Sequence, residues 1–269
     1  LRDNAILSFS VSPTGNIWIG SRQGLSCFLQ HEGRVVPVEL AYGERKVGEI
    51  SDLHEQDSLL WIATQGMGVI KDTLAWRSGQ PVVTPVKQLT AEEKEEYALH
   101  FQKIYPENDS ILWCTGKEGG LYRLHTAFAQ LEPVCWKGNA LREINGLCKD
   151  GQGDYLIGTN AGLLAYRPAD DSVWRKGADL PPFSVYGIMP EGAAGYWLGT
   201  NRGLLLYNAE SESGRVYDYR DGLAVGEFTE GACCKEEKTG LFLWGATDGF
   251  VAVRRDYFDE GQHYMPPVY

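Results

Sequence analysis

The stretch GYWLGTNRGLL at residues 195–205 decides the fold, because the same phrase occurs six times along the chain. In each copy an apolar strand ends in two small residues, and a short turn and a glycine lead into a second aliphatic run. The other copies are GNIWIGSRQGL (15–25), LLWIATQGMGV (59–69), ILWCTGKEGGL (111–121), DYLIGTNAGLL (154–164) and LFLWGATDGFV (241–251). A repeat of this length, carried by short strands, is typical of a β-propeller with one blade per repeat.

The spacing of the copies sets the domain organisation. The residues at the anchor position, 41 to 52 residues apart, are Trp18, Trp61, Trp113, Leu156, Trp197 and Leu243. We predict an all-β protein, a single β-propeller domain over residues 1–269 with six recognisable four-stranded blades. The repeats run approximately over residues 1–45, 46–96, 97–141, 142–182, 183–225 and 226–269.

The four anchor tryptophans lie in the middle of predicted strands. We therefore expect them to fill the space between neighbouring blades, where a large aromatic ring buries much apolar surface. The alternative is a ladder of rings that stack on sugars. The two interpretations differ in the exposure of Trp18, Trp61, Trp113 and Trp197, which are mostly buried in the first.

The longest interval separates the second and third anchors. Residues 80–96 carry Pro81, Pro85 and the charged run AEEKEE at 91–96. We predict a loop excursion on the propeller surface, with a short solvated helix that begins after Thr90 as its cap.

Composition and charge exclude several classes of function. The chain has 269 residues, with 36 acidic against 25 basic side chains and a net charge of −11, which disfavours contact with nucleic acid. No apolar run reaches the length of a membrane span. The six cysteines have no C-x-x-C pair and no histidine at ligand spacing, so we expect free thiols and no metal site.

Motifs for catalysis are also missing from the sequence. It contains no G-x-S-x-G, H-E-x-x-H, Walker or dinucleotide-binding fingerprint. The five histidines occupy no recurring place in the repeat. We therefore expect a binding protein with no catalytic residue and no cofactor. A propeller enzyme, a lyase or hydrolase acting on polysaccharide, stays open as an alternative. A protein-interaction scaffold is a second alternative, which the absence of a Trp-Asp dipeptide disfavours.

The repeated phrase resembles the two-component-regulator propeller repeat, found in the periplasmic sensor regions of hybrid two-component systems of Bacteroides. The most specific part is DGLAVGEFTEGA at 221–232, followed by the sixth copy and YMPPVY at 264–269, which resembles the last blade of such a sensor. Leu156 and Leu243 depart from the family pattern, because they replace the anchor aromatic.

The resemblance implies the C-terminal propeller portion of a sensor histidine kinase that responds to glycan-derived oligosaccharides. Such a chain would be periplasmic and non-catalytic, would work as part of a homodimer, and would meet the membrane only through segments downstream. Because the family usually closes seven blades, six repeats predict either a strained six-blade ring or an arc whose open edges pair with another chain.

The turns on one face of a propeller converge around the central channel, and loops on a rigid scaffold carry function. We therefore predict that ligand contacts come from turns between second and third strands and from the starts of first strands. The alternative is that these are ordinary solvated turn residues. The predicted ligand-binding residues are Arg22, Gln65, Lys117, Asn160, Tyr186, Arg202, Phe228 and Asp248.

Overall fold

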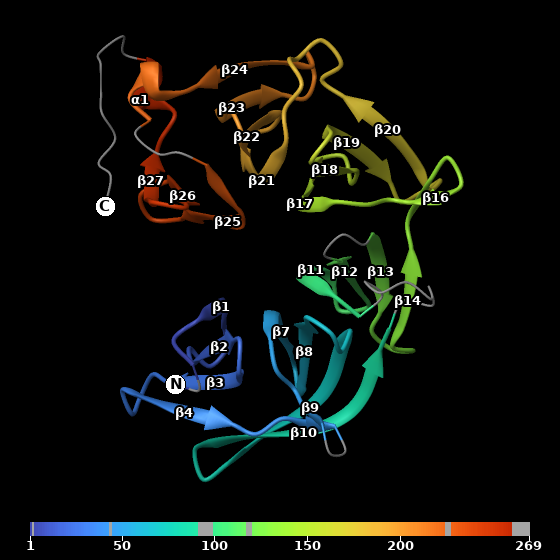
Figure 1. Cartoon of the computed structure of the whole chain (residues 1–269), viewed down its shortest axis with the longest axis vertical. Helices are drawn as coiled ribbons and strands as arrows, with labels where there is room; N and C mark the ends of the chain where they lie inside the picture. Colours follow the sequence, from blue (N-terminus) through green and yellow to red (C-terminus); the bar gives the residue numbers. More distant parts are fainter. Residues whose placement is uncertain (2, 43–44, 91–98, 117–119, 224–226, 260–269) are drawn as a thin grey trace. The chain divides into compact units, whose positions relative to one another are not determined.

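The computed structural model describes residues 1, 3–42, 45–90, 99–116, 120–223 and 227–259, and these form antiparallel sheets with the blade pattern of a β-propeller (Figure 1). The predicted fold class is confirmed. The chain divides into two compact units, Leu1–Glu143 and Ile144–Tyr269. That residues 1–269 form one domain, closed as a ring or open as an arc, stays a prediction.

The first unit contains three four-stranded sheets, each with its strands paired in chain order. The strands of blade one are β1 (Ile6–Val11), β2 (Ile17–Ser21), β3 (Gly24–Leu29) and β4 (Arg34–Val38). Those of blade two are β7 (Ile50–Gln56), β8 (Leu59–Thr64), β9 (Val69–Arg77) and β10 (Gln80–Leu89). Those of blade three are β11 (Phe101–Asn108), β12 (Ile111–Gly116), β13 (Leu121–His125) and β14 (Gln130–Pro133). Two short hairpins follow blades one and three, namely β5 (Ala41–Tyr42) with β6 (Arg45–Lys46), and β15 (Cys135–Trp136) with β16 (Asn139–Ala140).

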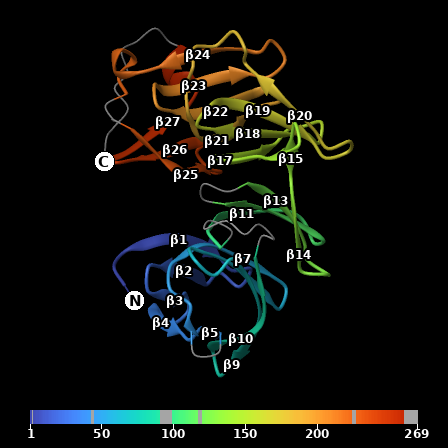
Figure 2. The ribbon, with the colours of Figure 1, turned by 45° about the vertical axis from the view of Figure 1, so that its right-hand side comes forward.

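The second unit contains blades four, five and six, and their first strands lie side by side (Figure 2). Blade four consists of β17 (Ile144–Lys149), β18 (Tyr155–Thr159), β19 (Gly162–Arg167) and β20 (Ser172–Lys176). Blade five consists of β21 (Val185–Glu191), β22 (Gly195–Thr200), β23 (Gly203–Asn208) and β24 (Ser213–Tyr217). Blade six has three strands within the described residues, β25 (Phe228–Glu236), β26 (Leu241–Ala246) and β27 (Gly249–Val253). The short helices are η1 (Tyr219–Asp221) and α1 (Asp256–Asp259).

The repeated Thr closes the turn between the second and third strands of a blade. In blade five the Thr200 hydroxyl donates to the Gly203 carbonyl oxygen at 2.8 Å and accepts from the Arg202 backbone N–H at 3.1 Å. Thr159 makes the same donated bond in blade four, at 2.9 Å to Gly162. Gly203 has φ 114°, a conformation that other residues rarely adopt. The repeated phrase thus specifies both a strand and the turn that ends it.

The four anchor tryptophans are buried, as predicted, and Trp18, Trp61 and Trp197 belong to clusters that join neighbouring blades. Trp18, Trp61, Trp113 and Trp197 are each at most 1% exposed. The Trp18 indole Nε1 donates to Glu55 Oε2 of the next blade at 2.5 Å, and the Trp197 ring lies 6.4 Å from that of Phe242 in blade six. Trp18 and Trp197 therefore connect neighbouring sheets within their units.

The predicted loop over residues 80–96 is wrong in its first part, because Gln80–Leu89 is strand β10. β10 is the outer edge strand of blade two. A proline has no N–H to donate, and on an edge strand this costs little where the N–H position faces solvent and not a neighbouring strand. The register between β9 and β10 shifts between Pro85 and Lys87, which accommodates the second proline in a bulge. The helix predicted near residues 91–96 lies outside the described residues.

The six cysteines carry no disulfide. Cys27 and Cys114 are fully buried, and burial raises the pKa of the Cys27 thiol to about 12, as expected for a small core residue. Within the described part of the chain, no helix has the length and apolar character needed to cross a membrane.

Candidate ligand-binding pocket of blade five

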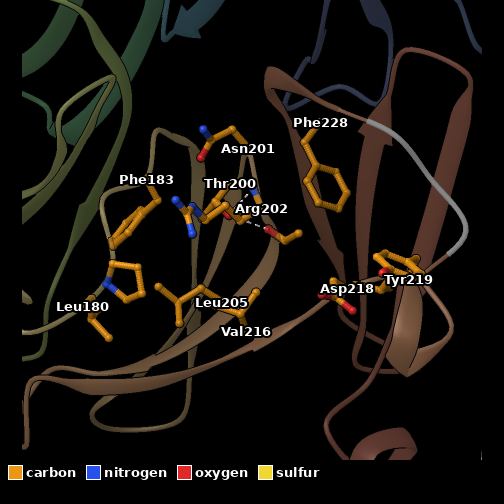
Figure 3. A pocket seen from close by; sticks show the side chains of 13 residues that line it. Leu180, Phe183, Thr200, Asn201, Arg202, Leu205, Val216, Asp218, Tyr219 and Phe228 are labelled. Atoms are coloured by element: carbon orange, nitrogen blue, oxygen red, sulfur yellow. Dashed lines mark hydrogen bonds between the residues drawn. The ribbon is translucent and has the colours of Figure 1, made fainter.

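The second unit contains a cavity of about 440 Å³, which we call the blade-five pocket (Figure 3). It opens where the β22–β23 turn meets the connections that enter β21 and leave β24. This is the face on which loops were predicted to gather. The apolar walls are formed by Leu180, Pro181, Phe183, Leu205, Val216, Leu223 and Phe228.

Two turns position the parts of the pocket wall that lie in the connections before β21 and after β24. The Leu180 N–H donates to the Gly177 carbonyl oxygen at 3.0 Å, and Gly177 has φ 65°, so the chain reverses after β20 and presents 180–183 to the pocket. On the other side Asp218 caps η1 through a capping box with Asp221. This capping box fixes the backbone of the segment that carries Tyr219 and Leu223.

Three polar groups at the pocket are already engaged by the fold. The Thr200 hydroxyl closes the turn described above. The Asn201 Oδ1 accepts from the Ser184 N–H at 3.0 Å. The Asp218 carboxylate accepts from the Arg220 N–H at 2.8 Å and lies 3.6 Å from the Arg220 Nε. Their positions are therefore set before any ligand binds.

Arg202 differs from these groups, because its guanidinium has no hydrogen-bond or ion-pair partner among the described residues. The side chain is exposed and extends along the pocket on the side of Phe183, while Asp218 and Tyr219 lie on the opposite side (Figure 3). An unpaired guanidinium beside apolar walls can bind an anion or a carbonyl oxygen.

A second group of polar side chains, which we call the polar row, crosses β17, β21 and the adjoining turns. The Asn145 Nδ2 donates to Asn160 Oδ1 at 2.8 Å, and the Ser184 hydroxyl donates to the Asn160 carbonyl oxygen at 3.0 Å. The Tyr186 hydroxyl donates to Glu227 Oε1 at 2.8 Å. Partial burial and then the Glu227 carboxylate raise the pKa of Tyr186 above its ordinary value. The row offers amide, phenol and carboxylate groups.

The predicted ligand-binding residues are distributed over several places. The blade-five pocket contains Arg202 and Phe228, and the polar row contains Asn160 and Tyr186. Asp248 is exposed in the β26–β27 turn. The other three residues are Arg22 and Gln65, in the first unit, and Lys117, outside the described residues.

Gln65 has a structural role in the first unit. Its Nε2 donates to the Phe101 carbonyl oxygen at 2.8 Å, and its Oε1 lies 3.1 Å from His100 Nδ1. Arg22 is exposed, and its backbone N–H donates to the Ala5 carbonyl oxygen at 3.1 Å. Neither side chain lines the cavity described above.

The strand register shows that the predicted turn residues occupy two different positions. Asn160 directly follows Thr159, which pairs with Gly162, whereas Arg202 comes second after Thr200, which pairs with Gly203. The residue of blade five that corresponds to Asn160 is Asn201, which sequence reasoning missed. Aligning the turns on their Thr and Gly would have found it. Phe183 had no comparable signal, because the connection before β21 has no repeated phrase.

No cluster of three or more His, Cys, Asp or Glu side chains in the described ranges is suited to hold a metal ion.

No family model matches the chain. No curated protein matches it. Among solved structures, 97% of the chain matches the extracellular domain of BT3049, assigned as a hybrid two-component system of B. thetaiotaomicron, with a TM-score of 0.79 and 19% identity. The extracellular domain of BT4673, given the same assignment in that organism, matches over 99% of the chain, with a TM-score of 0.76 and 15% identity. The chain has the propeller fold of these extracellular domains. It covers 35% and 36% of those two chains, so it spans about a third of their length.

Proposed function

We propose that this chain is a non-catalytic, ligand-sensing propeller in the periplasmic region of a hybrid two-component sensor histidine kinase. The observation that carries the proposal is the fold match over 97% of the chain to the extracellular domain of BT3049. At 19% identity this match concerns the fold alone, so the role in sensing rests on the fold together with the side chains at the turns of the second unit.

We propose glycan-derived oligosaccharides as the ligands, and the polar row as their contact surface. Sugar hydroxyls both donate and accept, so they need a surface that offers both functions. Asn160 supplies an exposed amide, Tyr186 a hydroxyl and Glu227 a carboxylate, while the buried Asn145 holds the Asn160 side chain in place. Tyr186 and the Glu227 side chain are accessible from solvent, which supports contact with an incoming sugar.

In the proposed sensor the signal passes through a homodimer, and the kinase and membrane-spanning parts lie elsewhere in the protein. Each blade is a hydrogen-bonded antiparallel sheet, in which the middle strands are paired on both sides and the first and last strands on one side, so we expect its internal shape to change little. A ligand on the turns is therefore expected to act by changing how propellers associate.

To test the proposal, the chain is titrated with a panel of plant and host oligosaccharides. Binding is measured by calorimetry and by the shift in the melting temperature of the protein. The same samples are analysed for products by chromatography. We expect at least one saccharide to bind and to be recovered unchanged. Tyr186→Phe, which removes the hydroxyl that faces Glu227, is expected to weaken binding, whereas Tyr105→Phe, on β11 of the first unit and outside both the polar row and the blade-five pocket, is the control. Binding by no saccharide, or turnover of one, contradicts the proposal.

A further inference from the structure

We propose that the blade-five pocket binds a small amphipathic carboxylate, with the carboxylate on Arg202 and an apolar or aromatic body against the walls around Phe183 and Phe228. This ligand differs from the oligosaccharide proposed above, and the pocket shares no lining residue with the polar row, which it adjoins at Asn201 and Ser184. The inference stands on the geometry of the pocket and not on the proposed sensing of glycans.

The walls of the pocket favour an apolar body. Leu205, Leu223 and Phe228 are at most 4% exposed and form its base, while Phe183 is half-buried and Val216 is 36% exposed at its edge. An aromatic or branched ligand placed on them removes apolar surface from water, which is favourable in proportion to the area. A sugar hydroxyl in the same place has no partner on these walls, and its burial is unfavourable.

Two side chains that line the pocket keep free hydrogen-bond donors. The Thr200 hydroxyl already donates and accepts, the Asn201 Oδ1 accepts from Ser184, and the Asp218 carboxylate is held by Arg220. In the described part of the chain, the Arg202 guanidinium and the Asn201 Nδ2 have no hydrogen-bond partner. The free guanidinium is cationic and only donates, so it favours a ligand end that is anionic and only accepts, and a carboxylate meets that condition.

Charge and size agree with this assignment. The Arg202 guanidinium lies on the side of Phe183 and the Asp218 carboxylate on the opposite side, so an anion on Arg202 is held away from Asp218 (Figure 3). The planar fork of a guanidinium matches the two oxygens of a carboxylate. A cavity of about 440 Å³ is within the range of small-molecule sites.

The test compares two probes with the same body. The whole chain is titrated calorimetrically with 4-phenylbutyrate and with 4-phenylbutanol, which lacks the charge. We expect saturable binding of the acid, about tenfold or more tighter than that of the alcohol, because hydrogen bonds to charged groups are the strong class. Arg202→Gln should reduce the affinity for the acid to that for the alcohol. Arg77→Gln, which removes an exposed arginine on β9 outside the pocket, should leave both affinities unchanged.

A second variant tests the walls independently of the charge. Val216→Trp fills the pocket from its exposed edge and should weaken binding of both probes, with the fold checked by circular dichroism. Equal affinity for acid and alcohol, unchanged binding by Arg202→Gln, or unchanged binding by Val216→Trp each overturns the proposal. Saccharide binding without binding of 4-phenylbutyrate overturns this inference alone, and the reverse result overturns only the proposed glycan ligand.

Discussion

Trp244 of β26 lies directly against Gly199 of β22, and this contact sets the spacing of blades five and six. A methyl group placed on Gly199 would lie 2.7 Å from Cζ3 of the Trp244 ring, closer than carbon atoms normally approach. Gly187 on β21 faces the same ring, at 3.1 Å for a methyl group there. The two glycines thus form the recess in which an indole that is 2% exposed is packed.

Gly199→Ala is expected to destabilise the chain by about 1–3 kcal/mol through overpacking against Trp244. Gly199 does not have a positive φ, so the cost is steric and not a matter of backbone strain. Gly151→Ala is the matched control, because a methyl group there meets open space. Urea unfolding monitored by fluorescence measures the change. The double variant Gly199→Ala/Trp244→Leu should lose less unfolding free energy than the sum of the losses in the two single variants. Losses that simply add would contradict the contact.

The repeat predicted the blades well, but it did not predict the role of Trp244. The sequence places Leu243 at the anchor position of the sixth copy, and in a strand a shift of one residue moves a side chain to the opposite face. The structure confirms the register, because Leu243 pairs with Ala252 and Trp244 with Val251. The large aromatic of blade six therefore faces blade five from the other side of its sheet.

Strand β10 shows where composition misled the prediction. Pro81 and Pro85 indicate a loop by local preference, yet both fit an edge strand whose outer side needs no ladder bond. Which strand is the edge depends on the order of strands in the sheet. Local sequence does not contain that information unless the blade has already been assigned.

The candidate site could be predicted in part for a similar reason. Arg202 lies in a turn that the repeat locates exactly, and Phe228 begins a first strand. Leu180 and Phe183 belong to a connection between blades that varies from repeat to repeat. That they line the same pocket as Val216 and Leu223 follows only from the folded arrangement of blade five.

The tryptophans of blades one and two should respond differently to loss of the indole N–H. Trp18 Nε1 donates to Glu55, whereas Trp61 Nε1 has no hydrogen-bond partner within the described ranges. Both rings are fully buried. Trp18→Phe is therefore expected to cost more than Trp61→Phe, by about 1.5–3 kcal/mol, the range for hydrogen bonds to charged groups. Denaturant unfolding of the two variants measures this, and equal losses would contradict a role for Glu55.

Thr200→Val should loosen the turn that carries Arg202. The substitution keeps the shape of the side chain but removes the hydroxyl that bonds Gly203 and Arg202, at an expected cost of about 1 kcal/mol or more. Thr200→Ser keeps the hydroxyl and is the control. We expect Thr200→Val to weaken binding of 4-phenylbutyrate as well, because Arg202 is less well placed. Stability measured by thermal unfolding should separate the two variants, and identical melting would show that the hydroxyl is dispensable.

Asp72 in β9 is expected to make stability depend on pH. It is 0% exposed, and the Tyr42 hydroxyl of the β5–β6 hairpin donates to its Oδ1. Burial raises the pKa of Asp72 to about 6, while the hydrogen bonds from Tyr42 and the Val86 backbone act in the opposite direction. The unfolded chain has the ordinary value of about 4. Between these two values the folded state binds more protons, so the contribution of Asp72 to stability falls as pH rises from about 4 to about 6.

The variant Asp72→Asn, which is neutral at every pH, should remove that dependence. We expect the stability of the wild type relative to Asp72→Asn to be greater at pH 4.5 than at pH 7.5, measured by urea unfolding at a series of pH values. Tyr42→Phe removes a donor to the carboxylate, so it should raise the pKa of Asp72 and extend the falling part of the curve to higher pH. A difference between wild type and Asp72→Asn that is independent of pH, or that increases with pH, would show that the buried carboxyl does not titrate in this window.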